Sequence, residues 1–283
     1  MLRRIAKAPL HWLLNIAGRA YVPGHRLEDA LGIAGKLAPG MACTLGYFHS
    51  PGDTPRRVAQ TDLAIAEAVA ALQPAGYVSI KAPACRYAPD LIDPIVLRAS
   101  ELGILAHFDS HETHTATATL ACVRRAAELG GAVGMTLPGR WRRSLEDAET
   151  AIRLGVRVRV VKGEWPDPAE PERNRDQGFL AVVERLAGRA AQVAVATHDP
   201  RMARESLSRL LEAGTQCELE LLNGLPRRRL LPIARELGVP LRIYIPFGIA
   251  WRPYALNKLG DNPRMLWWIA RDSLRGLLGT HRH

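Results

Sequence analysis

The chain has 283 residues, of which 47% are apolar, and a formal net charge of +10 at pH 7. This length suits one large domain with a sizeable core. No apolar run reaches the roughly 18 residues of a membrane span. No zinc finger or aromatic RNA-binding motif accompanies the basic residues, so we predict no nucleic acid partner. Four cysteines (Cys43, Cys85, Cys122 and Cys217) lie far apart without C-x-x-C spacing, which argues against a disulfide framework and predicts a reduced, cytoplasmic protein.

The first 40 residues precede the first predicted strand. The basic start, Met1 to Lys7, is followed by an apolar block that His11 and Asn15 interrupt, and no clear cleavage site is present. This pattern predicts helices that pack outside the main domain (1–40) rather than a signal peptide. As an alternative, the basic amphipathic start rests on anionic lipid, which would make the protein peripheral at the inner membrane.

Short apolar segments alternate with helix-period segments along residues 41–283. The predicted strands are 42–48, 77–82, 104–109, 132–137, 156–162, 193–197, 218–222 and 241–245. The predicted helices between them are 62–72, 115–129, 145–154, 176–187, 201–213 and 227–237. This order predicts a parallel sheet closed into a (β/α)8 TIM-type barrel. A doubly wound open sheet is the alternative, although the chain has neither a G-x-G-x-x-G turn nor a P-loop.

Charged and polar residues stand at nearly every predicted strand end, where the sites of such barrels lie. These residues are Lys81, Asp109, Arg159, Lys162, Thr197, His198, Glu220 and Tyr244. They predict a polar pocket for a large anionic ligand and a zwitterion. The alternative is an ion network inside the barrel, in which Arg159 and Lys162 pair with Asp109 and Glu220.

Histidine and acidic residues also gather around the third predicted strand. The set comprises His107, Asp109, His111, Glu112, His114 and His198. His107, Asp109 and His111 alternate and therefore face one side. Together the set is a candidate divalent-metal site for a barrel hydrolase. The segment H-E-T-H is one residue shorter than the zinc motif H-E-x-x-H.

The most specific pattern runs from Arg242 to Pro263. It reads R-I-Y-I-P-F-G-I-A-W-R-P-Y-A-L-N-K-L-G-D-N-P, a strand, a turn and a helix-period segment. It resembles the last strand and helix of the proline dehydrogenase family, R-I-Y-x-P-Y-G-x-x-W-x-P-Y-x-x-R-R-L-x-E-x-P. Further matches follow in order: 44–48 to T-L-D-Y-L, 79–81 to S-I-K, Asp109 to I-D-x-E, 159–165 to R-L-V-K-G-A-Y-W, 196–199 to A-T-H-N, and 218–224 to E-F-Q-x-L-x-G. The resemblance spans residues 21 to 263.

The resemblance implies an FAD-dependent oxidoreductase. It would transfer hydride from a proline-like secondary amine to the flavin, giving an imine (1-pyrroline-5-carboxylate if the amine is proline), with a quinone or another electron acceptor as partner. The catalytic residues implied are Lys81, Asp109, Arg159 and Tyr244. The substrate-binding residues implied are Lys81, Tyr244, Tyr254, Asn257 and Lys258. The cofactor-binding residues implied are Met135, Arg159, Val161, Lys162, Gly163, Trp165, Thr197, His198 and Glu220.

Several positions depart from the family pattern. Met135 and Glu220 stand where the family has glutamines, and Asn223 where it has a histidine. Asn257 and Lys258 replace the arginine pair that clamps the substrate carboxylate. One lysine attracts an anion but cannot grip it bidentately, so we predict that proline is not the preferred substrate. These changes also leave open a barrel that has lost its flavin and serves in binding.

Overall fold

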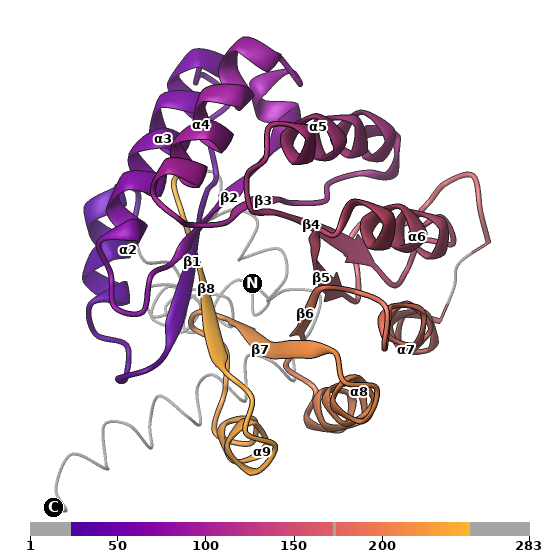
Figure 1. The fold of residues 1–283 in the computed structure, drawn as a ribbon. Helices are drawn as coiled ribbons and strands as arrows, with labels where there is room; N and C mark the ends of the chain where they lie inside the picture. Colours follow the sequence, from indigo (N-terminus) through magenta and orange to yellow (C-terminus); the bar gives the residue numbers. More distant parts are fainter. Residues whose placement is uncertain (1–23, 172–173, 250–283) are drawn as a thin grey trace, which may run out of the picture.

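Eight parallel strands, hydrogen-bonded in chain order, close into a barrel in this computed structural model, which describes residues 24–171 and 174–249 (Figure 1). The strands are β1 (Ala42–Tyr47), β2 (Tyr77–Ile80), β3 (Ala106–Phe108), β4 (Val133–Pro138), β5 (Arg157–Val161), β6 (Gln192–Ala196), β7 (Gln216–Leu222) and β8 (Leu241–Phe247). β1 pairs with β8 in parallel and completes the closure. The predicted (β/α)8 fold is confirmed.

Helices surround the barrel on its outside (Figure 1). They are α2 (Leu27–Ala34), α3 (Pro55–Ala70), α4 (Pro89–Glu101), α5 (Ala116–Glu128), α6 (Ser144–Leu154), α7 (Arg175–Leu186), α8 (Pro200–Glu212) and α9 (Leu231–Glu236), with 3-10 turns η1 (Ala82–Cys85) and η2 (Thr113–Thr115). Helix α2 precedes the barrel and contacts β8. Residues 35–40 of the predicted N-terminal helical segment are not helical, and residues 1–23 lie outside the described residues.

Two helices differ from the sequence-based expectation, and proline is involved in both. Helix α4 is not among the predicted helices, and it contains Pro89 and Pro94. Yet Pro89 occupies the first turn, where its missing N–H costs nothing. Helix α3 begins at Pro55, seven residues before the predicted start at 62, because Thr54 caps it by accepting a hydrogen bond from the Arg57 amide at 3.3 Å.

Strand alternation divides the side chains into two environments. On β5, Val158 and Val160 are fully buried between barrel and helices. Arg157 and Arg159 alternate with them and form ion pairs across the barrel interior to Glu218 and Glu220 on β7. The apolar core therefore lies between the strands and the helices, while the inside of the barrel is polar and charged.

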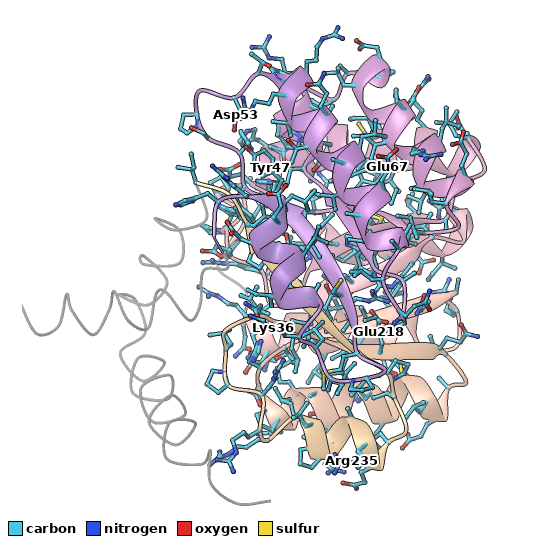
Figure 2. All side chains as sticks on the ribbon, turned by 90° about the vertical axis from the view of Figure 1, so that its left-hand side faces the viewer. Lys36, Tyr47, Asp53, Glu67, Glu218 and Arg235 are labelled. Carbon is cyan, nitrogen blue, oxygen red and sulfur yellow. The ribbon has the colours of Figure 1, made fainter. Side chains whose placement is uncertain are left out.

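The loop that follows β1 is anchored at its base. The Tyr47 hydroxyl donates to Asp53 at 2.7 Å, and Figure 2 shows both residues beside each other at the end of β1. Burial and the bond to Asp53 raise the pKa of Tyr47 to about 12, so the hydroxyl keeps its proton and remains a donor. Within the described ranges, no helix has the length and apolarity needed to cross a bilayer.

Candidate active site

Four of the predicted site residues meet at the carboxyl ends of the strands. Asp109, directly after β3, is the centre of this cluster. Its Oδ1 lies 2.6 Å from Arg159 Nη1, and its Oδ2 lies 3.4 Å from Lys81 Nζ. The Tyr244 hydroxyl on β8 donates to the same Oδ2 at 2.9 Å. Residues from four separate strands therefore converge on one carboxylate, as the strand-end pattern predicted.

Asp109 is held as an anion despite its burial. Loss of solvent raises the pKa of this carboxyl, but the charges of Lys81 and Arg159 outweigh that effect and lower the pKa to about 2. Tyr244 stays protonated, because burial and the neighbouring Asp109 raise the pKa of its hydroxyl well above the usual range. The pair thus has a fixed donor and a fixed acceptor.

Tyr244 reaches Asp109 only because of a glycine on the neighbouring strand. Gly46 on β1 faces the barrel interior, and a Cβ at this position would lie 2.2 Å from the Tyr244 hydroxyl and 3.3 Å from Lys81 Nζ. The tyrosine side chain therefore lies across the strand end, with its ring 5.0 Å from the guanidinium carbon of Arg159. The sequence alone does not predict this role of Gly46, because a strand glycine has several explanations.

The guanidinium of Arg159 is engaged on every nitrogen. Nη1 contacts Asp109 at 2.6 Å and Thr136 at 3.4 Å. Nη2 contacts Tyr77 at 3.1 Å and Glu220 Oε1 at 2.9 Å. Nε donates to Glu220 Oε2 at 3.1 Å. Part of the predicted interior ion network therefore exists, between Arg159, Asp109 and Glu220.

A second charged layer lies one step lower in the barrel. Arg157 forms an ion pair with Glu218, and Arg242 Nε lies 2.7 Å from the same carboxylate. The Tyr77 ring lies between them, 4.7 Å from the Arg157 carbon and 4.4 Å from that of Arg242. His107 completes the layer with a 2.8 Å hydrogen bond to Thr136. Sequence reasoning missed Tyr77 and Arg157, although their alternation with buried apolar residues was a usable signal.

Lys162 does not join this interior network. Its ammonium lies 2.6 Å from Asp176 and 3.6 Å from Asp199, outside the ring of strands. The alternative in which Lys162 pairs with Asp109 and Glu220 is therefore wrong. Lys162 directly follows the last residue of β5, and 35% of its side chain is exposed.

The residues predicted beside β6 hold the neighbouring loops. His198 Nδ1 lies 3.2 Å from the Pro226 carbonyl, and Nε2 accepts from the Leu222 amide at 2.9 Å. The ring therefore carries its proton on Nδ1 and fixes the loop after β7. Thr197 is buried, and its hydroxyl accepts from the Asp199 amide at 3.2 Å.

An aromatic pair covers the ends of β3 and β5. The rings of His111 and Trp165 stack with centroids 5.5 Å apart. Burial and the charge of Lys81 lower the pKa of His111 to about 4, so the ring is neutral at ordinary pH. Its buried Nε2 has no hydrogen-bond partner. Before Trp165, Gly163 adopts φ +91°, which turns the chain after Val161.

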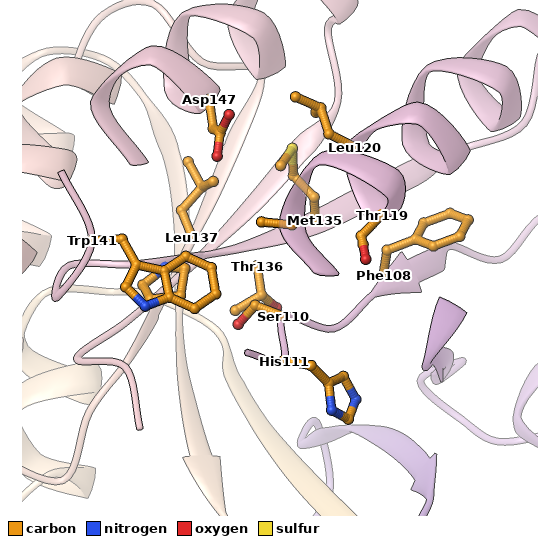
Figure 3. Close-up of a pocket in the computed structure, with 12 residues that line it drawn as sticks. Phe108, Ser110, His111, Thr119, Leu120, Met135, Thr136, Leu137, Trp141 and Asp147 are labelled. Atoms are coloured by element: carbon orange, nitrogen blue, oxygen red, sulfur yellow. The ribbon is translucent and has the colours of Figure 1, made fainter. Parts of the chain in front are cut away.

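Met135 lies on the other side of β4 from the charged cluster. Thr136 bonds to His107 and Arg159 inside the barrel, so alternation places Met135 on the outside, against α5. There it lines a pocket with Phe108, Leu120 and Leu137 (Figure 3). The pocket encloses only about 20 Å³, room for roughly one water molecule. Thr136 is therefore the β4 side chain that faces the interior.

The metal-hydrolase alternative receives no structural support. In the ranges that the structure covers, no three His, Cys, Asp or Glu side chains come together in a way that could hold a metal ion. His107 and His198 are instead committed to hydrogen bonds with their neighbours. The predicted substrate residues Tyr254, Asn257 and Lys258 lie outside the described residues.

The strand ends fit a flavin in three respects. Lys162 offers a partly exposed cation beside the β5 end. β6 contributes only the small Ala194 and Ala196 to the same side as the charged cluster, opposite Arg159 and Val161 in register. The buried Nε2 of His111 has no hydrogen-bond partner among the described residues and could bond to a ligand. Glu220 fits less well, since it occupies the guanidinium that the resemblance places beside the flavin ring.

Fold and site together define a (β/α)8 barrel with a charged interior and a polar cluster at its carboxyl-terminal mouth. No family model matches the chain. A proline dehydrogenase of Deinococcus radiodurans is 27% identical over 284 residues, covering 93% of this chain and 91% of that protein. Proline dehydrogenase 1 of Bacillus subtilis subsp. natto is 22% identical over 280 residues, covering 92% of each.

Solved structures agree on the fold. Proline utilization A from Bdellovibrio bacteriovorus, inactivated by N-propargylglycine, superposes with a TM-score of 0.73 at 17% identity over 90% of this chain. The present chain spans about a third (33%) of that protein. The comparisons confirm the resemblance to proline dehydrogenases that the strand-end motifs indicate.

Proposed function

We propose that this protein is an FAD-dependent oxidoreductase that oxidises proline or a proline-like secondary amine at its CH–NH bond. The observation that carries the proposal is the meeting of Lys81, Asp109, Arg159 and Tyr244 at one strand-end site. The similarity to proline dehydrogenases over more than nine-tenths of two relatives supports it. Those are the residue types and positions that the sequence resemblance assigns to catalysis.

The cluster suits an amine that carries an anion. Lys81 is 3% exposed and has one long carboxylate contact at 3.4 Å, with the Phe48 ring 4.1 Å away. An ammonium has three donors, so Lys81 retains capacity for a substrate carboxylate. The ring of Tyr244, fixed by its bond to Asp109, forms a wall against which the substrate ring packs.

The reaction balances as a two-electron oxidation. The C–H bond next to nitrogen breaks, its hydride leaves with both electrons, the nitrogen loses a proton to solvent, and a C=N bond forms. A bound flavin supplies the hydride acceptor for this step. The protein contributes the positioning of the amine, the exclusion of water and the surrounding charges.

FAD is the proposed form of the flavin, and the partly exposed cation of Lys162 at the β5 end supports a contact with its pyrophosphate. A quinone or another acceptor would then reoxidise the flavin, and the free cysteines support a reducing, cytoplasmic setting. Asn257 and Lys258, in place of the family's arginines, support a substrate with a smaller or missing carboxylate.

The test is anaerobic mixing of the purified, flavin-loaded protein with L-proline, pyrrolidine and other secondary cyclic amines. We expect loss of the oxidised-flavin absorbance with at least one of them, and none in Asp109→Ala. A protein that takes up flavin but is not reduced by any cyclic amine would contradict the proposed reaction.

A further inference from the structure

Glu220 is the most heavily satisfied carboxylate inside the barrel mouth. It receives Nε and Nη2 of Arg159, the Tyr77 hydroxyl at 2.9 Å and the Thr44 hydroxyl at 3.3 Å, with Arg157 Nη2 further away at 3.5 Å. It is 2% exposed. Burial acts to raise the pKa of Glu220, but Arg159 and the arginines near it lower the pKa below its ordinary value. Glu220 is therefore an anion fixed on one edge of Arg159.

The charges of this layer cancel. Lys81 and Arg159 supply two positive charges, and Asp109 and Glu220 supply two negative charges. In the strand-7 motif E-F-Q-x-L-x-G of the resembling family, position 220 is a neutral glutamine. A glutamine would leave the same layer with one uncompensated positive charge. Position 220 thus decides whether this upper layer is neutral or cationic, above a lower layer in which Arg157 and Arg242 exceed Glu218 by one positive charge.

A cation beside a flavin favours its reduced, negatively charged form, because a buried charge interacts strongly with another across a poorly screened site. We propose that Glu220 holds Arg159 in an ion pair and thereby lowers the electron affinity of the flavin in this protein. Glu220 acts through Arg159 and is a positioning residue. This inference rests on the proposed function, because it requires a flavin above the strand ends.

A weaker electron acceptor narrows the substrate class. Hydride then leaves most easily from amines that are oxidised readily, and a carboxylate on the carbon at the other side of the nitrogen, as in proline, withdraws electron density and makes oxidation harder. The neutral layer therefore points in the same direction as the loss of the two arginines at 257 and 258: toward a cyclic amine that carries a weaker or more distant anion.

The test is the redox equilibrium of the bound flavin in Glu220→Gln, measured against a reference dye by absorbance. We expect the ratio of reduced to oxidised flavin at a fixed dye potential to rise about tenfold over wild type, which is about 30 mV for a two-electron couple. Glu220→Asp keeps the charge, so its ratio should stay near that of wild type.

Glu218→Gln is the matched control. It removes the same charge from the same strand, about 7 Å lower, where Glu218 contacts Arg157 and Arg242 rather than Arg159. We expect less than half of the shift. Equal shifts in the two glutamine variants, or no shift in Glu220→Gln, would overturn the proposed role of Glu220.

Wild type alone provides a measurement that needs no variant to fold. Because the layer is neutral, its bound flavin should have a potential close to or below that of free FAD. A potential well above that of free FAD would overturn the inference while leaving the proposed oxidation intact. A protein that takes up no flavin would overturn both.

Discussion

Replacement of Gly46 by alanine tests the geometry of the barrel mouth. The new Cβ would lie 2.2 Å from the Tyr244 hydroxyl and 2.9 Å from its ring carbon Cζ. Real carbon atoms do not approach so closely, so the tyrosine must move. Its 2.9 Å hydrogen bond to Asp109 is then lost. Gly46 itself is paired on both sides in the barrel, so the strand cannot shift to make room.

The magnitude follows from two costs. Overpacking of this kind costs about 1–3 kcal/mol, and a lost hydrogen bond to a charged group costs about 1.5–3 kcal/mol. Alanine in place of glycine returns roughly 0.5–1 kcal/mol in a strand. We therefore expect Gly46→Ala to lower the free energy of unfolding by about 1.5–5.5 kcal/mol.

The assay is equilibrium unfolding in urea, with Gly52→Ala as the matched control. Gly52 lies in the turn after β1, and a Cβ added there would meet no atom within 4 Å, so its replacement should change stability by less than about 0.5 kcal/mol. Tyr244→Phe removes the closest clashing atom and should recover part of the loss in the Gly46→Ala background. Equal stability of the two alanine variants would refute the account of Tyr244.

Three further outcomes are expected. Because the pKa of Asp109 is lowered to about 2, its ionisation contributes stability that is present above the ordinary pKa of the carboxyl. The free energy of unfolding should therefore fall by up to about 2 kcal/mol from about pH 4 to about pH 2. An equally steep pH dependence of the unfolding free energy in Asp109→Asn would contradict this. Lys162→Ala should weaken flavin binding about 10- to 100-fold, whereas Lys36→Ala, before β1 and away from the strand ends (Figure 2), should leave flavin content unchanged. Asn257→Arg with Lys258→Arg should raise proline turnover by up to about 100-fold; flat turnover in a flavin-loaded protein would count against the substrate proposal.

The strands were predictable because each is a short, buried apolar run between turn residues. Strand-end chemistry was predictable for the same reason, since Lys81 and Asp109 directly follow such runs, whereas Tyr244 lies within β8. The partners of these residues were not, because they depend on which strands become neighbours across the barrel. Lys162 is an example. The sequence places a lysine directly after the fifth strand, but its ion pair with Asp176 depends on where the first turn of α7 lies in the folded barrel.

The sequence motifs also did not predict which side of a strand each side chain faces. A motif match assigns Met135 to the cofactor, yet Thr136 faces the interior, because a shift of one residue along a strand reverses the side. Tyr77 begins β2 and looks like an ordinary strand residue, although it bonds to Glu220 and Arg157 at the centre of the barrel.

We propose that the Asp109 cluster positions a cyclic amine for oxidation by a bound flavin. The most direct measurement is the absorbance of the purified, FAD-incubated protein before and after anaerobic addition of L-proline or pyrrolidine. The account predicts a yellow protein that one of these amines bleaches, with an imine formed in equal amount to the flavin reduced. A protein that stays colourless after incubation with FAD, or a yellow one that no cyclic amine bleaches, would contradict it.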